Sequence, residues 1–323
     1  MSGDPGYFGP DSMMWKVNKE ITVLFGGARA LLMHAAHPLI AAGARQTSFY
    51  QRDPWKRLIR TLSLQNSVTF GTKAEADESA HKINKLHEVI KGEDQVTGGF
   101  YDALDHEQLL WVHACLQVSS IYFYEKTVGK LTEEEKNKYH EENTLAAEMV
   151  LVDRNLMPKT HKELKEWVIK KSRENNYLVR TDVAMDVHDI IGGGPVPKHI
   201  KPIWPFIAFT AFNTLPTEFK DIYGISSSKP KTLLLNFNLF FVFFSKLSSS
   251  KFILFTISLV SFLISSSVTD ASTVLTILEI SCDVLSIVAL KVSFKSSTKF
   301  SSSIFDLICL ATLAISFDIS DHL

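Results

Sequence analysis

A break in composition near Ile225 divides the chain and limits how each side of it can fold. All 15 glycines of the 323 residues, and every arginine, tryptophan, tyrosine and methionine, lie before this point. The 98 residues that follow contain 23 serines and 12 phenylalanines. With no glycine and a single proline, Pro230, this second part has few residues suited to tight turns. We therefore predict a functional domain at residues 1–225 and a Ser/Phe/Leu-rich tail at residues 226–323.

Three interpretations of the tail are open: a frameshifted or wrongly joined translation, which we favour, a membrane-associated segment, or a soluble Ser/Phe-rich domain. Residues 232–245 and 252–268 carry no charge. Each stretch is shorter than the roughly 20 apolar residues that a spanning helix needs. Residues 274–290 contain Glu279 and Asp283, which are costly in a bilayer. Contact with a membrane is therefore expected only through this tail.

The charge balance argues against nucleic-acid binding. Lys and Arg number 34 against 35 Asp and Glu, and the net charge is −1, so the chain has no general attraction for phosphates. The cysteines, Cys115, Cys282 and Cys309, form no CxxC pair and no even set, as a disulfide framework or a thiolate zinc site would require. The N-terminus lacks the basic and apolar segments of a secretory signal. We expect a cytoplasmic protein, peripherally associated with or anchored to a membrane only if the tail is genuine.

Residues 1–225 have the pattern of a helical domain, because apolar residues recur at intervals of three and four. Strand-like alternation is scarce. The pattern therefore predicts an all-α fold, a single globular multi-helix domain. The predicted helices begin near Ser12, after the pair Gly26-Gly27 (broken or kinked at Pro38), and near Pro54, Thr72, Asp105, Thr132, His161 and Thr181.

One histidine occupies an inward position on the helix predicted to run from Lys73 to Lys91. The apolar stripe of this helix comprises Ala76, Ala80, Ile83, His87 and Ile90. His81, in contrast, lies on the polar side. A histidine within an apolar stripe needs a hydrogen-bond partner or a metal for its ring nitrogens. Periodicity alone favours a hydrogen-bonded core residue for His87 and leaves a metal ligand as the alternative.

Other histidines raise the same question. His113 shares a helix face with apolar residues, and His34 and His37 stand three residues apart. The chain has no HExxH motif and no paired Glu-x-x-His, which argues against a zinc protease or a di-iron protein. For His37, the alternative is a kink at Pro38 whose freed backbone carbonyl the ring helps to satisfy.

Three polar residues follow Pro54 on one face of a predicted helix. Arg57, Arg60 and Thr61 stand at i, i+3 and i+4, which places two guanidiniums and a hydroxyl together. Such a group can clamp an anion such as a carboxylate. The alternative is a solvated basic face that also includes Lys56.

Several sequence blocks then point to a known family. In chain order they are GDPGYFGPDSMMWKVNKEITVLFGGARALLMHAAHPLIAAG, RLIRTLSLQNSVTFGT, INKLHEVIKG and YDALDHEQLLWVHACL. They resemble the oxygenase family of the fungal mpaB proteins and the bacterial latex-clearing protein, also called rubber oxygenase. The resemblance spans about residues 3–224 and leaves the tail unmatched.

The resemblance implies that the all-α domain holds one haem b, with His87 as the axial iron ligand. The family's ligand motif matches Leu86-His87 with Lys91. Arg57, Arg60 and Thr61 repeat a spacing found near the haem of rubber oxygenase, where a lysine stands at the position of Arg60. Arginine stays protonated and cannot ligate iron, so the resemblance instead suggests that Arg57 pairs with a haem propionate or orients oxygen. His37 and His113 match the mpaB-like branch and are second-rank candidates for the pocket or the ligand.

The function implied is that of a haem-dependent oxygenase acting with dioxygen on an apolar, isoprenoid-like substrate. The haem performs the oxygen chemistry, and the protein orients it and excludes water. The glutamate proposed as the base in rubber oxygenase has no clear counterpart. This absence favours a first alternative, a non-catalytic haem-binding or redox protein. A second alternative is a haem-free helical structural protein in which His87 is an ordinary core residue.

Overall fold

The computed structural model describes residues 3–47, 49–198, 201 and 204–226. The predicted tail beyond residue 226 lies outside these residues, so the structure tests none of its three interpretations. The chain divides into two compact units, Met1–Pro197 with Ile207–Leu235, and Lys198–Phe206 with Asn236–Leu323. The candidate residues all belong to the first unit.

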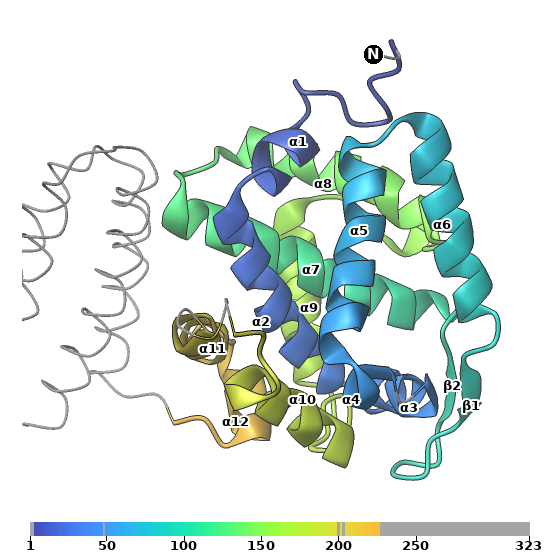
Figure 1. Ribbon diagram of the computed structural model, residues 1–323, viewed down its shortest axis with the longest axis vertical. Helices are drawn as coiled ribbons and strands as arrows, with labels where there is room; N and C mark the ends of the chain where they lie inside the picture. Colours follow the sequence, from blue (N-terminus) through green and yellow to red (C-terminus); the bar gives the residue numbers. More distant parts are fainter. Residues whose placement is uncertain (1–2, 48, 199–200, 202–203, 227–323) are drawn as a thin grey trace, which may run out of the picture. The chain divides into compact units, whose positions relative to one another are not determined.

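The described residues form helices joined by short connections, apart from one two-stranded hairpin (Figure 1). This confirms the all-α prediction. Strands β1 and β2 are antiparallel, with Gly92 opposite Tyr101, and the sequence pattern did not predict them. The elements are α1 (Met13–Asn18), η1 (Ile21–Leu24), α2 (Phe25–Ala35), α3 (Pro38–Thr47), α4 (Phe49–Arg52), α5 (Pro54–Phe70), α6 (Lys73–His87), β1 (Lys91–Glu93), β2 (Phe100–Asp102), α7 (His106–Thr127), α8 (Glu133–Met149), η2 (Arg154–Leu156), α9 (His161–Ser172), α10 (Asp182–Gly193), α11 (Trp204–Asn213) and α12 (Thr217–Tyr223).

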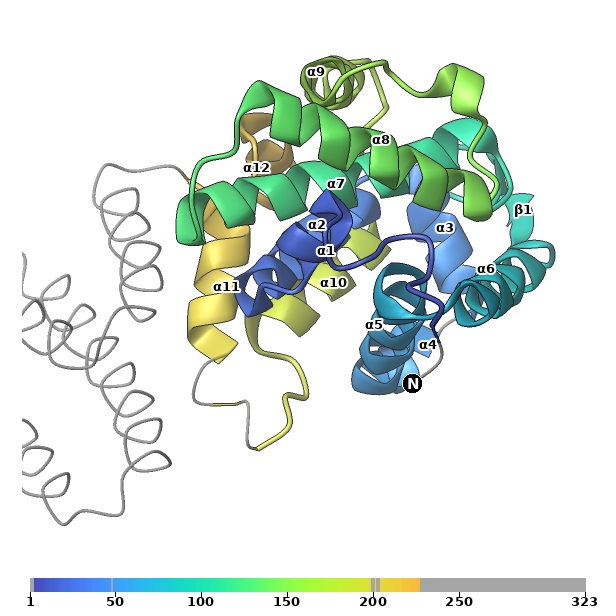
Figure 2. The ribbon, with the colours of Figure 1, turned by 90° about the horizontal axis from the view of Figure 1, so that it is seen from above.

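Helices α2 and α7 pack against each other at the centre of the main core (Figures 1 and 2). Trp111 and Cys115 of α7 are fully buried in this core with Met33 of α2. Cys115 is thus a core thiol, and burial raises its pKa. Arg29 of α2 is also buried there and donates hydrogen bonds to the Thr214 carbonyl and the Ser119 hydroxyl.

The pair Gly26-Gly27 does not separate two helices, as the sequence predicted, but lies inside α2. At Gly26 the backbone of α7 passes so close that an added Cβ atom would lie 3.1 Å from the Ser119 carbonyl oxygen. Gly26 therefore serves close helix packing rather than a turn. The first predicted helix instead ends at Asn18, and η1 connects it to α2.

Pro38 breaks the predicted small-residue helix into two. Helix α2 ends at Ala35 and α3 begins at Pro38, because proline cannot donate a helical hydrogen bond but suits a first turn. The helical path bends by 103° between the segments Ile21–Ala35 and Pro38–Thr47. Among the described residues no single helix is long and apolar enough to span a membrane, although this bent pair together has sufficient length and apolar content.

Threonines cap several helices as predicted. At the start of α8 the Thr132 hydroxyl accepts a hydrogen bond from the Glu135 amide, while the Glu135 carboxylate accepts from the Thr132 amide. Thr72 and Glu75 form the same capping box at α6. These contacts satisfy backbone amides that the first helical turn leaves unpaired.

Replacing Thr132 with alanine should lower the free energy of unfolding by about 1 kcal/mol, because the Glu135 amide loses its acceptor. Urea unfolding followed by circular dichroism would measure this. Thr132→Ser keeps the hydroxyl and should retain most of the stability. Equal losses in both variants would show that the cap contributes little.

Candidate functional site

The helix that carries His87 is shorter than predicted. Helix α6 packs against α5 and ends at His87, whereas the sequence predicted helix as far as Lys91. It ends early because Lys91 already belongs to β1 and pairs with Asp102 of β2. Ile90 is therefore not part of the helical stripe, although its amide still donates to the His87 carbonyl.

The His87 ring is half-buried, and its Nδ1 atom is buried without a hydrogen-bond partner among the described residues. Burial lowers the pKa of His87. The ring is therefore neutral near pH 7, the form that can ligate a metal. His81, earlier on α6, is exposed as predicted. A hydrogen-bonded core histidine, the interpretation that periodicity favoured, does not describe the Nδ1 atom of His87.

Large apolar side chains near His87 and on the adjoining helix are exposed. Leu86 and Val89 flank the histidine, and Val89 is 66% exposed. Leu58 and Ile59 of α5 are also exposed, Ile59 by 61%. Helices α5 and α6 lie side by side in both views (Figures 1 and 2). These side chains present apolar surface to solvent on two adjacent helices.

The three polar residues of α5 have different environments. Arg57 is half-buried, whereas Arg60 and Thr61 are exposed. The Thr61 hydroxyl donates a hydrogen bond of 3.0 Å to the Arg57 carbonyl of its own helix. Arg57 also acts electrostatically on His34 of α2. Arg57 therefore has an electrostatic interaction with a second helix, α2.

His34 links the two central helices, a role that its spacing did not reveal. Its Nε2 atom donates to the Val112 carbonyl of α7 at 2.9 Å, since a carbonyl can only accept. Burial lowers the pKa of His34 to about 4; the Val112 carbonyl opposes this shift and the charge of Arg57 adds to it. Sequence could not show this contact, because the partner is a backbone atom of a distant segment.

His37 lies at the junction of α2 and α3 and is only 6% exposed. Its ring is 4.6 Å from that of Tyr177 and 6.1 Å from that of Trp111, measured between centroids. Its Nδ1 atom has no hydrogen-bond partner among the described residues. The carbonyl of His34, which Pro38 leaves free, accepts instead from the His37 amide at 3.1 Å. The Nδ1 atom of His37 therefore makes no hydrogen bond to the freed carbonyl.

His113 lies away from His37. It follows Trp111 by two residues on α7, and two residues turn a helix by roughly 200°. His37 contacts the side of α7 that bears Trp111, whereas His113 interacts with the Asn143 carbonyl of α8. The two second-rank candidates thus occupy different sides of α7, and the structure does not bring them together.

The site contains no multi-residue metal centre within the described ranges, where no three His, Cys, Asp or Glu side chains are grouped to hold an ion. An axial ligand for haem iron needs only one histidine, so this finding leaves the role of His87 untested.

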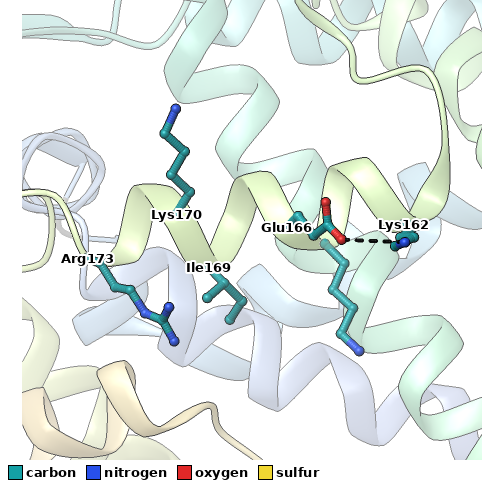
Figure 3. Close-up of a pocket in the computed structure, with 6 residues that line it drawn as sticks. Lys162, Glu166, Ile169, Lys170 and Arg173 are labelled. Carbon is teal, nitrogen blue, oxygen red and sulfur yellow. Dashed lines mark ion pairs between the residues drawn. The ribbon is translucent and has the colours of Figure 1, made fainter.

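A surface hollow of about 560 Å³ lies elsewhere, along α9 (Figure 3). Arg173 beside it pairs with Glu218 at 2.7 Å, and Lys162 approaches Glu166 at 4.0 Å. None of the candidate residues borders it, and its chemistry is that of a solvated basic helix face. The lining residues are Lys162, Lys165, Glu166, Ile169, Lys170 and Arg173.

The buried histidines predict loss of stability in mild acid. Burial lowers the pKa of four histidines from 6.5 to about 4. They are His34, His37, His113 and His161. At a pH between about 4 and 6.5 these histidines bind more protons in the unfolded chain than in the folded one. Their contribution to the free energy of unfolding is therefore fully present above about pH 6.5 and is lost as the pH falls toward about 4. Urea unfolding at about pH 7.5 and about pH 5 should show a decrease of several kcal/mol. An unchanged midpoint would contradict this prediction.

The sequence matches the profile of the family described as ER-bound oxygenase mpaB/B'/rubber oxygenase, catalytic domain, over residues 15–245. The chain therefore belongs to this family, which confirms the resemblance of the sequence blocks. The match continues past the composition break at residue 225, into residues outside the described ranges. Comparisons with curated proteins and with solved structures gave no significant match.

Proposed function

We propose that this protein is a haem b-dependent oxygenase that acts on an apolar, isoprenoid-like substrate with dioxygen. Its family is one of oxygenase catalytic domains, which suggests oxygenase activity. The observation that carries the haem proposal is His87, a neutral histidine with a buried, unpartnered ring nitrogen at the end of α6.

Two features of His87 and its neighbouring helices support the haem proposal. A ligating histidine needs a neutral ring, and it commonly uses its second nitrogen for a partner that fixes the ring. Because Nδ1 is buried, we propose that the other ring nitrogen of His87, Nε2, would bind the iron. The exposed side chains of Leu58, Ile59 and Val89 would lose contact with water on binding a flat apolar ring system.

Arg57 is the residue that we propose to bind a haem propionate, because it is half-buried and carries a permanent charge. A second role for Arg57 is to orient oxygen. Haem, when bound, would supply the activation of oxygen. We further propose Arg57, Arg60 and Thr61 as catalytic residues, on the spacing that resembles the haem surroundings of rubber oxygenase; Arg60 and Thr61 have the exposed positions described above. His37 and His113 remain second-rank candidates for the pocket or the ligand.

The proposal is tested by loading the full chain with haem and supplying squalene, an isoprenoid hydrocarbon, under ¹⁸O₂. We expect products cleaved at a double bond that carry ¹⁸O and exceed those formed by protein-free haem. Haem binding without such products would support the non-catalytic redox alternative, which the missing base favours. A folded chain that binds no haem would support the helical structural alternative.

A further inference from the structure

A chain of oxidisable aromatic rings runs from the main core to α9. Trp111 of α7 is completely buried. Its ring centroid lies 4.9 Å from that of Tyr177 and 6.0 Å from that of Trp167 on α9. Trp167 is half-buried, so it connects the interior with the surface. His37, one of the candidate residues, is buried and contacts the other end of this chain at Tyr177.

Two rings of this chain, those of Trp111 and Tyr177, place a polar atom in a buried environment. The Trp111 Nε1 atom is buried and lacks a hydrogen-bond partner within the described part of the chain, whereas the buried Tyr177 hydroxyl interacts with the Glu107 carboxylate. Most buried polar groups in folded proteins are hydrogen-bonded, so the unpaired indole nitrogen of Trp111 requires an explanation. Hydrophobic packing alone would be served equally well by phenylalanine.

A proton acceptor lies beside Tyr177. Burial raises the pKa of Tyr177, and the negative charge of Glu107 raises it further. Lys171 binds Glu107 at 2.9 Å and lies 5.3 Å from the centre of the Tyr177 ring. Loss of an electron makes a phenol strongly acidic, and the Glu107 carboxylate is then placed to take its proton.

We propose that Trp167, Trp111 and Tyr177 form a one-electron relay between the surface of α9 and the interior beside His37. Adjacent rings at these separations exchange electrons rapidly by tunnelling. Near neutral pH a tyrosine that can release its proton is easier to oxidise than a tryptophan. Tyr177 is therefore the site at which an oxidising equivalent comes to rest.

An oxidant removes one electron from a tryptophan of the relay, leaving an indole cation radical. Tyr177 returns one electron to that tryptophan, and the phenolic O–H bond breaks as its proton moves to the Glu107 carboxylate. The products are the reduced oxidant, a neutral Tyr177 radical and a protonated Glu107. In the working protein the oxidant would be a one-electron oxidant derived from dioxygen or peroxide. This choice of oxidant rests on the proposed function.

Laser flash photolysis tests the relay in the full chain without haem, so failure of the relay is distinguished from failure of haem binding. A ruthenium tris-bipyridine sensitiser with persulfate oxidises accessible tryptophan. In the wild type we expect the tryptophanyl radical absorption to decay as the tyrosyl absorption rises, at a rate independent of protein concentration. Tyr177→Phe should slow this rise at least tenfold and prolong the tryptophanyl signal.

Matched variants identify the route. Trp111→Phe should suppress the tyrosyl signal as strongly as Tyr177→Phe, because it removes the middle ring. Trp15→Phe should have no effect, since Trp15 contacts Phe70, which these oxidants do not oxidise. Tyr101→Phe removes a tyrosine outside the chain of rings and should also leave the transfer intact. An unchanged tyrosyl rise in Tyr177→Phe would overturn the proposal. This variant removes a single hydroxyl and keeps the ring, so it tests the relay even if Trp111→Phe does not fold.

Discussion

Replacing His87 with alanine is expected to abolish stoichiometric haem binding. The proposed bond between iron and an imidazole nitrogen would be lost, and α6 offers no second inward histidine, because His81 is exposed. Loss of an outer-shell partner typically weakens metal binding by roughly 10–100-fold, so loss of the ligand itself should weaken it by more. Titration of haem followed at the Soret band would measure the change in affinity.

The variant His81→Ala is the matched control, since it removes an exposed histidine from the same helix and should leave the titration unchanged. Free imidazole added to His87→Ala should restore the spectrum in part, because it can occupy the vacated space. A spectrum in His87→Ala identical to that of the wild type would assign the ligand elsewhere, and His113 would be the next residue to replace.

Replacing Gly26 with valine should lower the free energy of unfolding by about 1–3 kcal/mol, as overpacking between two core helices commonly does. The Cβ atom alone would lie 3.1 Å from the Ser119 carbonyl oxygen and 3.4 Å from the Phe123 ring. These obstacles belong to α7, which the main core holds on its other sides. The α2–α7 contact would have to open to accept the side chain.

Gly27 provides the control within the same turn of α2. A Cβ atom there meets nothing within 4 Å, so Gly27→Ala should gain roughly 0.5–1 kcal/mol of stability from its better helix propensity. Urea unfolding of both variants against the wild type measures the difference. A Gly26→Val variant as stable as Gly27→Ala would show that the α2–α7 approach is not tight.

Helix positions followed from local signals in the sequence. Asp105 and Thr132 cap helices where expected, and Pro54 stands in the first turn of α5. The pair Gly26-Gly27 misled the prediction, because a glycine can mark either a turn or a close helix crossing. Only the position of α7, set by contacts distant in sequence, distinguishes the two.

The candidate site was predictable in part. The stripe spacing placed His87 on the inward face and His81 on the outward face, in agreement with their exposure. The bond from His34 to Val112 and the cluster of His37 with Tyr177 could not be predicted, since each joins segments that are distant in sequence. The separation of His37 from His113 likewise depends on which neighbours surround α7. The roles of the candidate residues, the domain boundary at residue 225 and the cytoplasmic location remain predictions.

The central claim, that this chain binds one haem b, is tested most directly by the visible absorption spectrum of the full-length protein. The chain would be expressed with a haem precursor, purified, and measured oxidised and reduced, with a pyridine haemochrome determination of haem per chain. The account predicts a Soret band and one haem b for each chain. A folded, helical and colourless protein would contradict it.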